Sequence, residues 1–293
     1  MSERPISTPA LIADTTVHDL APAHGGDPYR IFLHVPAKPE PQAGWPVLYM
    51  TDGNAVIGTA VDAMRAPAGY PLGTNVEEGI IVAIGYPVAG AYDPLRRSWD
   101  LGPPPGNTYP PFHDGGPEVR TGGAEEFLAF IEDELKPWVA NRTRIDSSRQ
   151  ALYGHSFGGL FALYALFTRP LAFQTWIAAS PAIYWEDRLI DRFLQAFEAA
   201  VPDGLMTQVM LSAGEYETEK LAPFQIGAAD EAKRLEHKKL TRTDEFARQM
   251  AERLGTIPGL SAGFELHAGE NHMSILPVTV NRAVQAAFAV HRP

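Results

Sequence analysis

The chain of 293 residues is 45% hydrophobic and 10% aromatic, which is enough to bury a substantial core. Its net charge of −11 lacks the basic excess that a nucleic-acid or anionic-membrane surface needs, so we expect neither partner. The absence of cysteine excludes disulfides, zinc–thiolate sites and a cysteine nucleophile. We expect no metal and no cofactor, and the composition leaves the oligomeric state open.

The N-terminal segment and the apolar stretches bear on where the protein resides. Residues 1–16 (MSERPISTPALIADTT) contain no basic segment followed by an apolar run, which a signal peptide would have. No stretch approaches the uninterrupted apolar length that a transmembrane helix requires. We therefore expect a cytoplasmic protein.

The first predicted elements are strands. Residues 14–20 and 29–36 are rich in β-formers and are separated by a glycine-rich break, which favours an antiparallel pair. Residues 45–50 and 79–87 are continuous apolar runs, typical of strands buried on both faces of a parallel sheet. A short helix is predicted between them, at 54–66.

Residues 88–121 are rich in glycine and proline and are too long for an ordinary connection. Their aromatic and arginine content favours a binding loop over a linker. Apolar residues at helical spacing then predict a helix over 123–142.

The second half of the chain alternates strands with helices, which predicts an α/β fold with a mostly parallel, doubly wound sheet and an antiparallel N-terminal strand pair. We expect one domain over 1–293. A polar helical insertion at about 219–245 is interpreted as a solvated helix face, with a mobile lid as the alternative. The predicted strands are 150–155, 173–181, 207–215 and 262–269, and the predicted helices are 157–169, 188–200, 219–254 and 275–290.

Ser156 lies at the centre of Gly154-His155-Ser156-Phe157-Gly158. An apolar strand precedes this motif and an apolar helix follows it, which is the order that a nucleophile elbow needs. The following helix N-terminus favours negative charge at this point. We interpret Ser156 as a nucleophile; a purely structural glycine turn is the alternative.

A serine nucleophile of this kind needs a histidine base later in the chain. His237 lies in a charged helical run, His267 lies within the last strand, and His291 is two residues from the C-terminus. His272 instead follows the last strand in a loop, at the edge of the sheet where the serine is expected. We therefore predict His272 as the base.

The acid that orients the histidine should follow the preceding strand. Glu215 and Glu217 both occur there, and on an extended chain they would lie on the same face. We favour Glu217, because the extra residues past the strand give it reach to the His272 loop, and Glu215 stays as the alternative. The acid would fix the imidazole tautomer and stabilise the imidazolium.

The oxyanion that forms during ester cleavage needs two backbone donors. One is the N–H of Phe157, the residue after the nucleophile. The other is expected in the loop after strand 45–50, at Gly53 or Asn54. These residues also fit a turn and a helix cap, and both roles are compatible.

Eight stretches, in order between about residues 28 and 290, together resemble a known family. The sequence is similar to the α/β-hydrolase esterase family that includes ferric-siderophore esterases acting on enterobactin, salmochelin, bacillibactin and fusarinine-type trilactones. The resemblance implies an α/β-hydrolase fold, an esterase activity and a glutamate as the acid. The stretches are WPVLYMTDGNAVI, IIVAIGYP, RRSWDLGPPP, GGAEEFLAFIEDELKPWV, LYGHSFGGLFALYALF, AASPAIYW, SAGEYE and GENHMSILP.

The same resemblance implies substrate contacts. An arginine in the family's RRxxDLTP segment lines the site, which here implies Arg96 or Arg97 beside Trp99, with Gly102 in place of the threonine. Charge and stacking by such a pair suit a bulky anionic ligand. The alternative is that one arginine pairs with Asp100 or Asp93 and only shapes the loop. Tyr184 and Trp185 are expected to add an aromatic wall.

We therefore predict a serine carboxylesterase that acts on a small-molecule ester through an acyl-enzyme, with a siderophore trilactone as a candidate substrate. The alternatives are a generic acyl or thioester hydrolase and a noncatalytic binding protein of the same fold. Thioester hydrolases of the S-formylglutathione type usually carry aspartate as the acid. The glutamates of the sequence GEYE therefore argue against this alternative.

Overall fold

A computed structural model describes residues 10–290 of the chain. Its centre is an eight-stranded sheet in the order β1-β2-β4-β3-β7-β8-β9-β10. From β4 to β10 every neighbouring pair is parallel, whereas β1–β2 and β2–β4 are antiparallel. This confirms the predicted sheet and the antiparallel N-terminal pair. The strands are β1 (Thr15–Leu20), β2 (Tyr29–His34), β3 (Trp45–Met50), β4 (Ile80–Gly85), β7 (Ile145–His155), β8 (Thr175–Ala179), β9 (Thr207–Gly214) and β10 (Leu260–His267).

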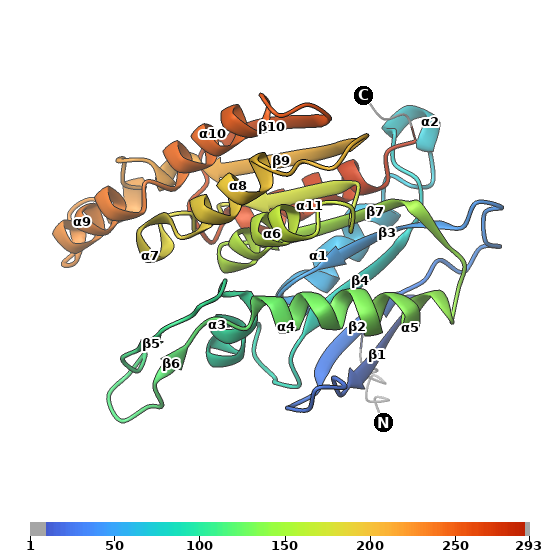
Figure 1. Cartoon of the computed structure of the whole chain (residues 1–293), viewed down its shortest axis with the longest axis horizontal. Helices are drawn as coiled ribbons and strands as arrows, with labels where there is room; N and C mark the ends of the chain where they lie inside the picture. The colour runs from blue at the N-terminus through green and yellow to red at the C-terminus, as the bar shows by residue number, and fades with distance from the viewer. Residues whose placement is uncertain (1–9, 291–293) are drawn as a thin grey trace, which may run out of the picture.

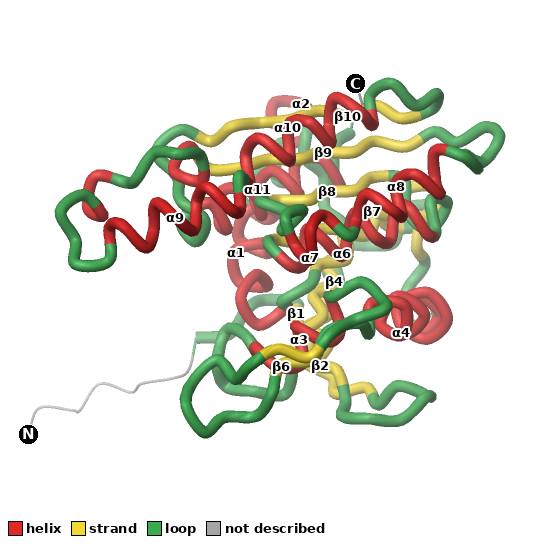
Figure 2. The backbone as a smooth tube through the Cα atoms, turned by 60° about the vertical axis from the view of Figure 1, so that its left-hand side comes forward, coloured by secondary structure: helices red, strands yellow, loops and turns green. Residues whose placement is uncertain are grey.

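Helices cover both faces of the sheet, as Figures 1 and 2 show. One core lies between the sheet and α1 with α11, and the other lies under α4, α6, α8 and α10. β3 and β4 are buried along their whole length because both faces are covered. The helices are α1 (Gly53–Arg65), α2 (Pro71–Thr74), α4 (Ala124–Ala129), α5 (Lys136–Ala140), α6 (Phe157–Thr168), α7 (Trp185–Arg188), α8 (Ile190–Glu198), α10 (Thr243–Leu254) and α11 (Ile275–Ala287), with a π-helical turn η1 (Phe130–Leu135) between α4 and α5.

Residues 88–121, predicted as a long loop, contain regular structure. Asp93 starts a helix there, because its carboxylate accepts a hydrogen bond from the backbone N–H of Arg96 and Pro94 occupies the first helical position. Asp-Pro is also a common turn pair, so the start of this helix resembles loop sequence. The elements are the helix α3 (Pro94–Leu101) and a short hairpin of β5 (Thr108–Tyr109) and β6 (Val119–Arg120).

The polar region after β9 forms separate pieces. A single 3₁₀ turn, η2 (Glu215–Glu217), follows the strand directly, and a second, η3 (Pro223–Gln225), comes next. The helix α9 (Glu231–Thr241) extends beyond the sheet, at the far left of Figure 1, whereas α10 packs against the sheet. The predicted helix over 219–254 is thus divided, and only its second half contributes to the core.

The parallel arrangement brings five strand ends to one edge of the sheet. Thr51 and Asp52 follow β3, Ser156 follows β7 and Ser180 follows β8. The turn η2 follows β9, and the loop that contains His272 follows β10. This edge is where α/β folds build their sites. Within residues 10–290, no helix is both long enough and apolar enough to cross a bilayer.

Close packing at Gly154 provides a test of this fold. A Cβ on Gly154 would lie 1.9 Å from the carbonyl oxygen of Gly158, so we expect Gly154→Ala to lower the free energy of unfolding by about 2 kcal/mol or more. Gly263 is the matched control, because a Cβ there would meet no atom within 4 Å. Urea denaturation of both variants measures the difference. Equal stability of the two would contradict the packing at this turn.

Candidate active site

Ser156 occupies a strained turn between β7 and α6. Its φ of 61° and ψ of −115° are sparsely populated for any residue other than glycine. Its backbone N–H donates to the carbonyl of Ala179 at the end of β8, over 2.9 Å. Its carbonyl accepts from Leu160 and Ala182. The neighbouring elements therefore hold the conformation that strains the serine.

Glycines allow the surrounding backbone to approach this turn. A Cβ on Gly158 would lie 2.3 Å from the hydroxyl oxygen of Thr51, and one on Gly159 would lie 2.9 Å from the carbonyl of Ala179. The first turn of α6 is thus packed directly against the segment that precedes α1. A larger side chain at Gly158 would push these two segments apart, and one at Gly159 would push α6 away from the end of β8.

Ser156, His272 and Glu217 form a continuous chain of hydrogen bonds. The hydroxyl of Ser156 lies 3.0 Å from Nε2 of His272, and Nδ1 of His272 lies 2.5 Å from a carboxylate oxygen of Glu217. In the tautomer that fits both contacts, Nδ1–H donates to the carboxylate and Nε2 accepts from the hydroxyl. The three groups come from separate strand ends, and the structure brings all three together.

Glu217 is buried, with 6% of its surface exposed. Burial alone would raise its pKa, but the hydrogen bond and charge of His272 and the hydrogen bonds of Ser180 and Gly214 together outweigh burial and leave the pKa lowered. Ser180 and Gly214 add to this effect: the Ser180 hydroxyl donates to Glu217 over 2.5 Å and the Gly214 N–H donates over 2.8 Å. Glu217 is therefore an ionised carboxylate with fixed partners.

Ser180 was not singled out in the sequence, although it ends β8 at the same edge as the other groups. Its φ of 43° is again unusual for a residue with a side chain, and it is fully buried. The sequence feature that could have identified Ser180 is its position directly after a buried strand and before Pro181. A polar residue at such a strand end is a candidate for contact with the site.

The structure separates the two candidate acids. They were expected to share one face of an extended chain, but Glu215 and Glu217 lie in the 3₁₀ turn η2, where residues two apart point in different directions. That expectation was wrong because the chain turns as soon as β9 ends. Glu217 contacts His272, whereas Glu215 accepts from the backbone N–H of Gly269 over 2.9 Å.

His155, which the sequence pattern also did not single out, lies against His272. The ring centroids are 4.7 Å apart, and His155 is buried. Burial, together with the nearby charge of His272, lowers the pKa of His155 to about 3. His155 is thus neutral at neutral pH and supports the ring of His272 by packing.

The other three histidines that follow Ser156 in the sequence were the alternatives to His272. His267 is buried at the end of β10, in line with its predicted place in a strand. His237 is exposed on α9, but it also lines a cavity beside His272, which its position in a charged run did not indicate. His291 lies outside the described residues.

Two helix N-termini meet beside Ser156. Phe157 is the first residue of α6 and Gly53 is the first residue of α1, and these helices follow the adjacent strands β7 and β3. Backbone N–H groups in a first turn have no acceptor within their own helix and attract negative charge. The side chain of Asn54 accepts from Tyr86 N–H and donates to the carbonyls of Tyr86 and Val88, so it ties α1 to the end of β4.

Arg97 and Arg96 have different partners, although they are adjacent. Arg97 forms a two-point ion pair with the buried carboxylate of Asp52, at 2.9 and 3.0 Å, and its guanidinium lies 6.0 Å from the ring of Phe157. Arg97 therefore lies next to the start of both helices. Asp52 in turn has a left-handed backbone at the start of α1.

Arg96 and Trp99, which were also expected to contact substrate, have other partners in this structure. Arg96 donates to the carbonyls of Asp27 and Pro28 and stacks on Tyr29, so its guanidinium holds the N-terminal hairpin. Trp99 packs under Arg120. Adjacent helical residues point about 100° apart, so only one of two neighbouring arginines can face the serine.

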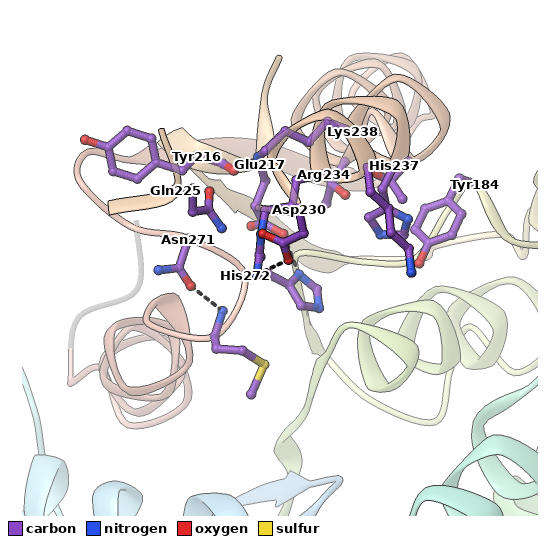
Figure 3. A pocket seen from close by; sticks show the side chains of 14 residues that line it. Tyr184, Tyr216, Glu217, Gln225, Asp230, Arg234, His237, Lys238, Asn271 and His272 are labelled. Atoms are coloured by element: carbon purple, nitrogen blue, oxygen red, sulfur yellow. Dashed lines mark hydrogen bonds and ion pairs between the residues drawn. The ribbon is translucent and has the colours of Figure 1, made fainter. Parts of the chain in front are cut away.

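A cavity of about 450 Å³ opens beside His272 and Glu217, and Figure 3 shows its lining. Tyr184 lines this cavity, as expected for an aromatic wall. Trp185 does not line it, but its ring packs 4.6 Å from that of Phe157. Among the described residues there is no cluster of His, Asp and Glu side chains that could hold a metal ion.

Comparison with known proteins assigns the family. The model of the family named Esterase matches residues 23–253, which is more than half of the chain. The chain belongs to the esterase family. This esterase is 36% identical over 283 residues to the ferri-bacillibactin esterase BesA of Bacillus subtilis, covering 96% of this chain and 91% of the relative. It is also 36% identical to the siderophore triacetylfusarinine C esterase of Aspergillus fumigatus, covering 90% and 89%.

A solved structure supports the same assignment. The BES protein from Bacillus cereus superimposes on this esterase with a TM-score of 0.81 and 28% identity, covering 99% of this chain and all of that one. The fold and the family together make the protein a carboxylic ester hydrolase that acts on a small-molecule ester.

The buried His155 predicts how this esterase responds to acid. Its folded-state pKa of about 3 lies below the ordinary value of 6.5, so its stabilising contribution is complete above pH 6.5 and is lost as the pH falls. Relative to His155→Gln, the wild type should lose about 2 kcal/mol of unfolding free energy between pH 7 and pH 5. Urea denaturation at both pH values measures this. Parallel pH profiles would contradict the buried neutral state.

Proposed function

We propose that the protein is a serine esterase in which Ser156 attacks the carbonyl carbon of a carboxylic ester. The observation that carries this proposal is the hydrogen-bonded chain from Ser156 through His272 to Glu217, at 3.0 and 2.5 Å. The strained turn at Ser156, between a strand and a helix, supports the same role.

In the proposed reaction, Nε2 of His272 takes the proton of the Ser156 hydroxyl as the oxygen attacks. The ionised Glu217 stabilises the imidazolium and keeps Nδ1 protonated, which its lowered pKa supports. The tetrahedral intermediate collapses when His272 returns the proton to the leaving alcohol, and an acyl-enzyme remains. Water, activated by the same histidine, then releases the acid.

The oxyanion is proposed to be held by backbone N–H groups at the starts of α6 and α1. Phe157 supplies one donor, and Gly53 or Asn54 supplies the other. The side chain of Asn54 already binds Tyr86 and Val88, so its contribution is through the backbone. The Arg97–Asp52 ion pair is proposed to fix the α1 start, in addition to the substrate contact expected of Arg97.

The proposed substrate class is a siderophore trilactone. This proposal is supported by the two relatives at 36% identity, both of which are named as esterases of siderophores and are matched over nearly their whole length. Tyr184 and Trp185 are the aromatic residues proposed to contact the substrate. The site lies within one proposed domain and uses neither metal nor cofactor.

The first test removes the nucleophile. We expect Ser156→Ala to lower kcat/KM for p-nitrophenyl butyrate by more than about 10⁴-fold, since no other group supplies the covalent step. The variant should also lose labelling by a fluorophosphonate probe while its circular dichroism spectrum stays unchanged. Wild-type turnover in a folded Ser156→Ala variant would overturn the assignment of Ser156.

The second test separates the two glutamates. Glu217→Gln should lower kcat by roughly 10³–10⁴-fold, because an amide neither stabilises the imidazolium nor enforces the tautomer. Glu215→Gln is the matched control: its amide oxygen can still accept from Gly269, so we expect kcat within a few-fold of wild type. Steady-state kinetics on p-nitrophenyl butyrate compares them, and a larger loss at Glu215 would reverse the assignment.

A further inference from the structure

The cavity beside His272 is bounded on one side by α9. Helical positions 233, 234, 237, 238 and 241 all line it, which places them on one face of the helix. The acidic Glu236 faces a different hollow, together with Lys239. We call Lys233, Arg234, His237 and Lys238 the α9 face; Figure 3 shows three of them, Arg234, His237 and Lys238, beside His272.

The α9 face is positively charged in a protein whose net charge is −11. Arg234 is paired with Asp230, at 2.8 Å, so these two charges offset each other. Lys238 donates to the carbonyl of Tyr216, a neutral acceptor, and the charges of Glu217 and Asp244 act on it without forming an ion pair. Lys233 is exposed and adds a second positive charge, which acts on Asp230.

The remaining groups of the cavity do not cancel this charge. Glu217 also lines it, but its carboxylate is buried and bonded to His272. Burial lowers the pKa of His237, and His272 and Lys238 lower it further, so His237 is a neutral hydrogen-bonding ring at pH 7. A ligand here meets two lysines, the Arg234–Asp230 ion pair and the ring of Tyr184 within one space.

We infer that the α9 face binds a negatively charged iron chelate that forms part of the substrate, next to the ester bond that Ser156 cleaves. This inference rests on the proposed function. A ferric complex of three catecholates keeps a net negative charge, because the catecholates carry more negative charge than the iron carries positive. A ferric complex of three hydroxamates is neutral. The α9 face therefore selects tris-catecholate over tris-hydroxamate trilactones.

The physical basis for this selection is electrostatic. Opposite charges in a partly enclosed cavity attract more strongly than in bulk water, and a neutral chelate gains nothing from the lysines. The catechol rings can also stack on Tyr184 and Tyr216, both of which line the cavity. The volume of about 450 Å³ lies within the range of small-molecule sites.

The test compares two variants, each of which reverses one charge on a different side of the helix. Lys233→Glu changes the cavity side, and Lys239→Glu makes the same change on the opposite side. In the Ser156→Ala background, which cannot turn over the substrate, Kd is measured by tryptophan fluorescence for ferric enterobactin, a tris-catecholate, and for ferric triacetylfusarinine C, a tris-hydroxamate. We expect Lys233→Glu to weaken binding of ferric enterobactin at least tenfold and to leave the tris-hydroxamate within twofold.

Lys239→Glu should leave both Kd values within twofold, and about 0.5 M NaCl should reduce the effect of Lys233→Glu. Equal weakening by both variants would point to the overall charge of the protein, and no weakening by Lys233→Glu would exclude the α9 face; either result overturns the inference. Turnover of p-nitrophenyl butyrate by the wild type is measured separately. Its absence would refute the proposed function, whereas normal turnover with unchanged Kd values would refute only the charge selection.

Discussion

The strained backbone at Ser156 is the constraint on which the rest of the site depends. A residue with a side chain adopts this φ only where its surroundings compensate for the strain. Here the compensation is tertiary, because the N–H of Ser156 is bonded to Ala179 and its carbonyl is bonded to two further residues. Positions 154 and 158 then require glycine, since a Cβ would meet the backbone of Gly158 at the first and the side chain of Thr51 at the second. The glycines of the proposed nucleophile motif are thus a packing requirement.

A parallel sheet brings the residues of the site together, because all its parallel strands end at the same edge and the residue after each strand lies there. Four successive strand ends contribute Ser156, Ser180, Glu217 and His272. These residues are far apart in sequence, and the sheet brings them together. Of these residues, Glu217 needs the most support from its surroundings to remain ionised. Its burial opposes ionisation, and three donors from different segments are needed to keep it charged.

The sequence predicts most of the fold, because the buried strands are continuous apolar runs and the N-terminal pair is rich in β-formers. It also predicts Ser156 and His272 as partners, since both directly follow strands that end at the same edge. It favoured Glu217 but kept Glu215 as an alternative, because their directions depend on a 3₁₀ turn that no residue type enforces. The sequence also could not show which of Arg96 and Arg97 lies beside the Ser156 turn, since their partners are distant in sequence. Those partners are Asp27, Pro28 and Asp52.

The exposure of His272 has a consequence for how the enzyme is approached. Its side chain is 43% exposed, while the carboxylate that orients it is almost wholly covered. The proposed base is therefore held through its buried partner and open to solvent on its other side. A bulky ester can reach it directly from solvent and still occupy the adjoining cavity with the rest of the molecule.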